Sequence, residues 1–264
     1  MFVTPPQQEH RQTVAIRLGI TLLLLLPIGL LVLAGLGESP GKIETVPLAI
    51  AAVLVVLCIV LWVVIGKATL AIHPEGLRKT TAFGQTEIRW EDVLETRYRV
   101  IPVQVGGLIG YAATAAARRV GGKGATSSLR LLVIARDGSK ILVTSNYKGA
   151  LEAIGVILAK IQPPILADAR RRVEAGESVA FGPLSVSRAG VAWKRKEPIP
   201  FADLSMASIV GQYLRLKRKG KMFDVAKVRS DNVPNVLVFL DLIEGLGAGA
   251  GEIKGIDPLA RVRI

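Results

Sequence analysis

Two long apolar runs fill the first quarter of the chain, and the charged positions lie almost entirely after them. Residues 16–36 and 46–66 are each 21 residues long, and Arg17 is the single charged residue within them. As helices they would each be about 31 Å long, which matches a hydrocarbon core of about 30 Å. We therefore expect an N-terminal two-helix transmembrane hairpin, which turns at Ser39-Pro40-Gly41.

Basic residues beside the two runs predict their orientation. The connection between the runs contains Lys42 as its one basic residue. The opposite flanks carry Arg11, Arg17, Lys67, Arg78 and Lys79. Because Lys and Arg are enriched in cytoplasmic flanks, we expect a multi-pass protein of the cell membrane with two spans and with both termini and the soluble part in the cytoplasm.

After residue 66 the apolar positions alternate with a period of two, which is typical of strands. The strand-like runs are 69–72, 77–81, 86–90, 93–103, 129–135 and 140–144, separated by turn signals such as Asp137-Gly138. Residues 148–161 then have helical spacing, and Pro163-Pro164 is expected to end that helix. A short helix over 165–176 follows in this interpretation.

The same order of patterns occurs again in the second half. Phe201-Ala202-Asp203 corresponds to Trp90-Glu91-Asp92, and Leu214-Arg215-Leu216 corresponds to Leu129-Arg130-Leu131. A final helix is expected to begin at Asn232, which would act as its N-cap. The pattern favours two copies of one unit, and a single mixed α+β domain with chance similarities is the alternative.

Antiparallel strands followed by one amphipathic helix resemble a pleckstrin-homology-like (PH-like) barrel, in which the helix covers the open end of a bent sheet. The expected fold class is therefore a transmembrane hairpin followed by an α+β, mainly β soluble part with two tandem PH-like barrels, each closed by a C-terminal helix. The expected divisions are 1–15 (N-terminal segment), 16–66 (hairpin), 67–162 (first PH-like domain), 163–177 (helical linker), 178–245 (second PH-like domain) and 246–264 (tail).

Several segments resemble a bacterial family, the domain of unknown function 6585 family. They are 174–190, Phe201-Ala202-Asp203, Gly220-Lys221 and Val233-Pro234-Asn235-Val236, and the resemblance covers residues 67–245. It implies the fold and the membrane tethering, and it carries no catalytic motif. The chain departs from the family by a Gly/Ala-rich insertion, 106–128, which is either disordered or contains a short helix lying on the bilayer.

Charge is distributed unevenly along the chain. The net charge is +13, and it lies wholly in residues 67–264, where 31 basic side chains outnumber 18 acidic ones. A basic domain next to a bilayer is drawn to anionic headgroups by about 1 kcal/mol for each Lys or Arg near the surface. The alternative is that these residues reflect only the positive-inside bias of cytoplasmic segments.

The densest basic cluster is expected on a hairpin of the second copy. The candidate residues for anionic-ligand or lipid binding are Arg215, Lys217, Arg218, Lys219 and Lys221, with Lys194, Arg195 and Lys196, which precede a nearby strand and could join the same face. A loop rich in Lys and Arg can surround a phosphate group. A solvated hairpin is the alternative, and nucleic acid is a weaker candidate because no aromatic residues alternate with these charges.

The sequence shows no arrangement typical of catalysis. His10 and His73 are the only histidines, Cys58 is the only cysteine, and Gly121-Gly122-Lys123-Gly124 lacks the spacing of a phosphate-binding loop. We expect no enzyme activity, no cofactor and no metal. The expected function is a membrane-anchored binding or scaffolding protein that engages the lipid bilayer, its anionic headgroups or a protein partner, with self-assembly as a homo-oligomer within a membrane complex as the alternative.

Overall fold

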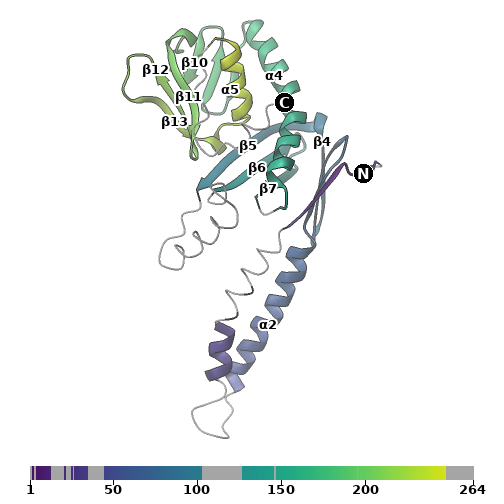
Figure 1. The fold of residues 1–264 in the computed structure, drawn as a ribbon. Coiled ribbons are helices and arrows are strands. Elements are labelled where there is room, and N and C mark those ends of the chain that lie inside the picture. The colour runs from purple at the N-terminus through teal and green to yellow at the C-terminus, as the bar shows by residue number, and fades with distance from the viewer. Residues whose placement is uncertain are drawn as a thin grey trace. The chain divides into compact units, whose positions relative to one another are not determined.

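The chain forms two compact units in a computed structural model (Figure 1). The residues that the structure describes are 4–12, 27–34, 45–102, 127–145, 147–194 and 196–247, with Phe2, Thr21 and Leu25. The first unit is Met1–Glu87 with Asn146–Lys148, and the second is Ile88–Ser145 with Gly149–Ile264. This division follows contacts between residues, and the domain boundaries drawn from the sequence stay a prediction.

A four-stranded antiparallel sheet forms the folded part of the first unit. Its strands, β1 (Gln8–Arg11), β2 (Thr69–Ile72), β3 (Gly76–Thr81) and β4 (Gly84–Arg89), are paired in that order. Leu70, Ile72 and Leu77 are buried in it, as their alternation predicts. The sequence analysis missed β1, because four mostly polar residues carry no strand pattern.

Strand β1 connects two distant parts of the sequence. It pairs with β2 so that Arg11 lies opposite Thr69 and Gln8 lies opposite Ile72. The segment between Arg11 and Thr69 therefore begins and ends at the same end of two paired strands. Lys148 joins this arrangement through its backbone N–H, which donates to the carbonyl of Arg11 at 2.9 Å.

Helix α2 (Thr45–Gly66) is apolar on all sides, and most of its large side chains are exposed. By length and composition alone, two described helices could cross a membrane: Val46–Val64 within α2, and α4 (Ala150–Glu174) in the second unit. These two differ in burial, because α4 has a buried face that includes Ile154, Ile157 and Ile161. A helix whose apolar face is already covered by protein is typical of a domain core, whereas α2 has apolar surface to place against lipid.

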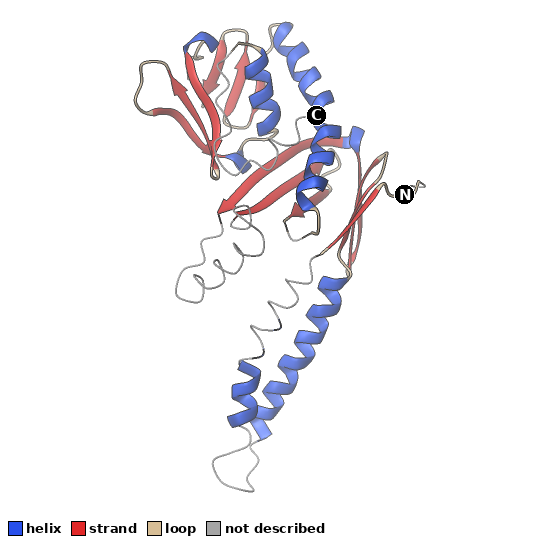
Figure 2. Ribbon diagram, viewed as in Figure 1, coloured by secondary structure: helices blue, strands red, loops and turns tan. Residues whose placement is uncertain are grey.

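The second unit contains three separate antiparallel sheets among its described residues (Figure 2). One sheet consists of β5 (Val93–Pro102), β6 (Ser127–Ala135) and β7 (Lys140–Thr144). The second consists of β8 (Val179–Phe181), β9 (Leu184–Ser187) and β10 (Gly190–Trp193), and the third of β11 (Leu204–Val210), β12 (Tyr213–Arg218) and β13 (Asp224–Arg229). Helix α4 lies between β7 and β8 in sequence, and α5 (Val236–Gly245) follows β13.

The core of the second unit lies where α4, α5 and the strands meet. Phe239 of α5 is fully buried, and its ring lies edge-on to Phe181 of β8 with 5.5 Å between centroids. Helices α4 and α5 pack against each other, and α4 also contacts β7 and β8. The two helices thus bury their apolar faces against each other as well as against strands.

The fold class predicted from the sequence is wrong on two points. The described sheets remain open, each with two free edges, so they do not form two PH-like barrels closed by helices. Among the described residues, the helices that pass the length and composition test are α2 and α4, which is not the predicted N-terminal pair. Of the predicted span 16–36, only Thr21, Leu25 and residues 27–34 are described, and these are helical.

The physical reason for the error about the barrels is that alternation predicts strands without predicting their partners. Closing a barrel requires an unbroken ladder of hydrogen bonds around the sheet. Here short 3-10 helices, Trp90–Asp92 and Phe201–Asp203, separate β4 from β5 and β10 from β11, and the strands on either side belong to different sheets.

The helix boundaries also differ from the prediction. Helix α4 continues through Pro163 and Pro164 as a single element, because buried residues on both sides, Ile161 before and Ala169 after, hold it in place. Each proline removes one backbone hydrogen-bond donor, and packing on both sides compensates for that loss. Helix α5 begins at Val236 instead of Asn232, because Ser230–Asn232 form a separate 3-10 helix.

The predicted insertion 106–128 lies outside the described residues, except where β6 begins at Ser127. Of the predicted tail 246–264, Leu246 and Gly247 are described.

Candidate functional site

The β12–β13 hairpin carries the basic cluster that the sequence analysis singled out. In β12, Leu214 and Leu216 are buried, and the alternate positions Tyr213, Arg215 and Lys217 lie on the opposite face of the strand. Gly220 at the turn has a φ of +70°, which a glycine adopts without strain. The Lys221 N–H donates to the Arg218 carbonyl at 3.1 Å and closes this turn.

The two arginines of the cluster have acidic partners. The Arg218 guanidinium donates to an Asp203 carboxylate oxygen at 2.7 Å, and the Asp203 carbonyl also accepts from the Lys219 N–H at 2.7 Å. Arg215 Nε lies 3.7 Å from the Asp224 carboxylate. These contacts lie toward the turn end of the hairpin, and they partly neutralise both arginine charges.

The three lysines of the cluster differ from the arginines. No acidic group among the described residues lies within ion-pairing distance of Lys217, Lys219 or Lys221. Lys219 and Lys221 are exposed, and Lys217 is half-buried. Over residues 213–229 the sequence has seven basic side chains and one acidic side chain, Asp224. The hairpin therefore presents a local excess of positive charge.

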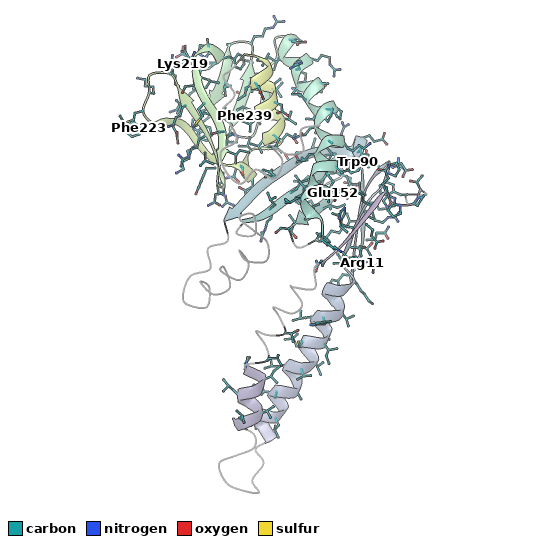
Figure 3. The ribbon with its side chains drawn as sticks, viewed as in Figure 1. Arg11, Trp90, Glu152, Lys219, Phe223 and Phe239 are labelled. Atoms are coloured by element: carbon teal, nitrogen blue, oxygen red, sulfur yellow. The ribbon has the colours of Figure 1, made fainter. Side chains whose placement is uncertain are left out.

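The tip of the hairpin also carries apolar residues that the sequence analysis did not select. Met222 and Phe223 are 84% and 81% exposed, directly after Lys221. Figure 3 shows Lys219 and Phe223 at the free end of the hairpin, away from the buried Phe239. The available signal in the sequence was a Met-Phe pair directly after the basic cluster of the predicted hairpin, where polar turn residues are the usual choice.

The other predicted basic residues follow β10, a strand of a different sheet. Lys194 follows β10 in a left-handed backbone conformation with a φ of +49°, and its Nζ lies 5.3 Å from the centre of the Trp193 ring. The Lys196 N–H donates to the Trp193 carbonyl and forms a turn there. Arg195 lies outside the described residues. No described interaction joins this turn to the β12–β13 hairpin.

A polar network lies at the end of β13, opposite the hairpin tip. Asp231 accepts from Arg229 at 2.7 Å and forms an ion pair with Arg99 of β5 at 3.4 Å, and Arg99 also donates to Gln212 at 3.1 Å. Burial alone would raise the pKa of Asp231, but hydrogen bonding and charge from Arg229, with the Arg99 charge, bring that pKa below its usual value. The network joins β5 to the third sheet. Its two arginines, Arg99 and Arg229, are engaged in contacts within the protein.

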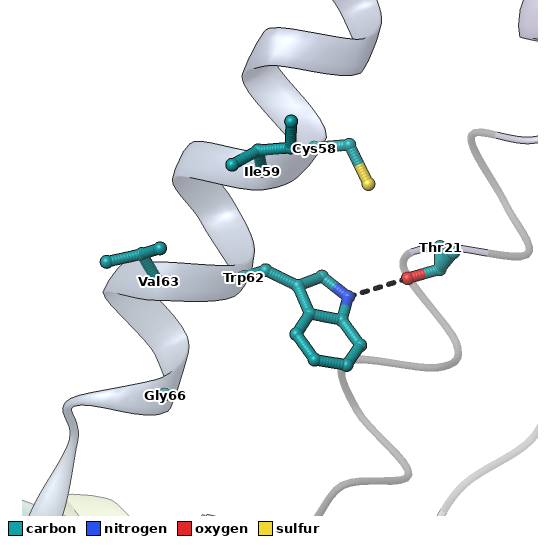
Figure 4. Close-up of a pocket in the computed structure, with 6 residues that line it drawn as sticks. All are labelled: Thr21, Cys58, Ile59, Trp62, Val63 and Gly66. Carbon is teal, nitrogen blue, oxygen red and sulfur yellow. Dashed lines mark hydrogen bonds between the residues drawn. The ribbon is translucent and has the colours of Figure 1, made fainter.

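An apolar groove beside α2 is lined by Thr21, Cys58, Ile59, Trp62, Val63 and Gly66 and has a volume of about 620 Å³ (Figure 4). The Trp62 indole N–H donates to Thr21 Oγ1 at 2.7 Å across this groove. The lining offers no titratable pair, and its two nucleophilic groups are the Cys58 thiol and the Thr21 hydroxyl. The remaining lining is apolar.

Groups able to perform chemistry are sparse in the part of the chain that the structure describes. No cluster of three potential metal ligands occurs there. His10 and His73 each use Nδ1 to donate to a backbone carbonyl, of Lys148 and of Thr4, at 2.9 Å. The absence of enzyme activity, cofactor and metal stays a prediction.

Comparison with known proteins identifies the family of this chain. No curated protein and no solved structure matches it. A family described as "Family of unknown function (DUF6585)" matches residues 4–249, which extends beyond the region of resemblance seen in the sequence and confirms that resemblance. The chain therefore belongs to the DUF6585 family of unknown function.

Proposed function

We propose that this chain is a membrane-anchored, non-enzymatic binding protein whose β12–β13 hairpin engages anionic lipid headgroups. The observation that carries the proposal is the set of three lysines, Lys217, Lys219 and Lys221, without an acidic partner among the described residues. Two arginines beside them are held by Asp203 and Asp224 and so shape the hairpin.

Lysine suits this role because its ammonium group is a compact charge on a flexible stem that can follow a phosphate at a moving surface. A Lys or Arg near an anionic leaflet contributes about 1 kcal/mol, and salt weakens that attraction. Three lysines would thus give a few kcal/mol at most. That is enough to orient a domain that is already tethered, and it is weak for recruiting a free one.

The tether in this proposal is α2, whose apolar side chains are exposed around the helix axis. Pairing of β1 with β2 requires the flanks at Arg11 and Thr69 to share one side of a bilayer, so the intervening segment would cross it an even number of times. The excess of basic residues in these flanks favours the cytoplasmic side. We propose a cell-membrane protein with its folded units in the cytoplasm.

Hydrogen exchange on the full chain in nanodiscs tests the lipid contact. We expect the backbone amides of residues 217–223 to exchange more slowly in discs with phosphatidylglycerol than in discs of phosphatidylcholine alone. The difference should shrink at high salt, because screening weakens attraction between exposed charges.

A charge-matched pair of variants tests the residues. The triple variant Lys217→Gln, Lys219→Gln, Lys221→Gln should lose the difference between the two lipids. The control Lys140→Gln, Lys148→Gln, Lys160→Gln removes the same charge from exposed positions elsewhere and should keep it. Equal exchange of these amides in both lipids for the natural chain would exclude the proposal.

A further inference from the structure

We infer that Met222 and Phe223 insert into the bilayer at the level of the headgroups and upper acyl chains, and so form an apolar wedge at the tip of the β12–β13 hairpin. This inference rests on the proposed function, because the wedge would enter the same anionic bilayer whose headgroups the hairpin is proposed to bind. It adds a contact that charge alone does not supply.

Nothing among the described residues covers these two side chains. The other phenylalanines of the second unit, Phe181 and Phe239, are buried in its core, and a third, Phe201, is half-buried. Met222 and Phe223 are instead 84% and 81% exposed. Two adjacent large apolar side chains in water at a turn are unfavourable unless something covers them.

Their neighbours favour a lipid surface as the partner. Lys219 and Lys221 directly precede the apolar pair, and a lysine can lay its aliphatic stem along apolar surroundings while its ammonium group stays at the phosphates. Asp224, the nearest acidic residue, lies 3.7 Å from Arg215, so its charge is partly offset. Basic residues around exposed apolar side chains are the pattern of proteins that bind membrane interfaces.

A second exposed phenylalanine shows what distinguishes this tip. Phe83 in the β3–β4 turn is 88% exposed, yet residues 80–88 contain no Lys or Arg and do contain Glu87. Exposure alone would select both turns. Charge complementarity to an anionic bilayer selects the β12–β13 tip.

The test uses the full chain in nanodiscs with a fluorophore whose emission depends on polarity. Cys58→Ala removes the native cysteine, and Val225→Cys places the label beside the tip while leaving Met222 and Phe223 intact. We expect a blue-shifted emission and quenching by nitroxide-labelled lipids in discs that contain phosphatidylglycerol. The label at Ala189→Cys, an exposed turn between β9 and β10, is the matched control and should stay in a water-like environment.

The double variant Met222→Ser, Phe223→Ser tests the wedge itself. Its ratio of inserted to free tips should fall about ten-fold or more, because two large apolar side chains no longer leave water. The lysines remain, so slowed exchange of the hairpin in anionic discs should persist in part.

The outcomes separate the two proposals. A label that stays water-like while the hairpin amides still exchange slowly in anionic discs would overturn the wedge and leave headgroup binding intact. Quenching of equal strength in neutral and anionic discs would support the wedge and overturn the role of charge. A natural chain with neither signal would overturn both.

Discussion

At the scale of single residues, one glycine, Gly190, occupies a position where no side chain fits. Gly190 begins β10 with a φ of +131°, in the region that residues with a side chain rarely adopt. A Cβ atom added there would lie 1.9 Å from the Ile199 carbonyl oxygen. This close approach allows Val191 and Ile199 to exchange backbone hydrogen bonds at 2.9 and 2.8 Å.

Gly190→Ala should therefore destabilise the second unit strongly, by about 3 kcal/mol or more, because both the backbone conformation and the contact must change. The measurement is the free energy of unfolding of the full chain in detergent, followed by near-UV circular dichroism. Gly211→Ala is the control: its φ is +60° and the space around it is open, so the loss should be about 1–2 kcal/mol. Equal losses would contradict this explanation.

At the scale of elements, the start of α5 is held by a strand far away in sequence. Asn235 has a left-handed conformation with a φ of +51°, and its Oδ1 accepts from the Thr96 backbone N–H at 2.8 Å. The Asn235 N–H donates to the Thr96 carbonyl, also at 2.8 Å. Asn235 thus continues the ladder of β5 in place of a strand partner, and it fixes where α5 begins.

Asn235→Ala should lower the free energy of unfolding by about 1–3 kcal/mol, because it leaves the N–H of the buried Thr96 without its acceptor. It also places alanine, which has no side-chain hydrogen bond to compensate, at a positive φ. Asn235→Asp keeps an acceptor at the same place and should lose less. Urea unfolding at neutral pH measures both variants, and a larger loss for Asn235→Asp would argue against this role.

At the scale of the whole molecule, β1 determines how the chain is routed. It precedes the apolar segment, pairs with the strand that follows that segment, and so brings Arg11 and Thr69 together. Sequence reasoning described residues 1–15 as an N-terminal segment and predicted no strand there, since pairing between residues about 60 positions apart leaves no local pattern.

A cysteine pair tests this route. In the Cys58→Ala background, Arg11→Cys with Thr69→Cys should form a disulfide on mild oxidation, because directly opposite strand residues have Cα atoms about 4.5–5.5 Å apart. Thr80 pairs with Thr69 from the other side, so Arg11→Cys with Thr80→Cys spans two strand spacings, about 10 Å, and should not cross-link. Gel mobility without reductant measures both pairs, and cross-linking of the second pair alone would refute this register.

The sequence by itself determined the local elements, because side-chain periodicity and turn chemistry act over a few residues. It predicted β2, β3 and the β6–β7 hairpin nearly to the residue, and it located the basic cluster at Arg215–Lys221. It also predicted α2, whose apolar length needs no partner to be recognised.

Tertiary structure alone decided which strands pair, where the helices pack and which charges are neutralised. The sheets stay open and α4 packs on α5, because pairing depends on contacts between distant residues that alternation does not encode. Likewise, Asp203 and Asp224 engage two arginines of the basic cluster and leave its lysines without an acidic partner among the described residues. That division, and the exposure of Met222 and Phe223, exists only once the hairpin has folded, because both depend on what lies nearby in space.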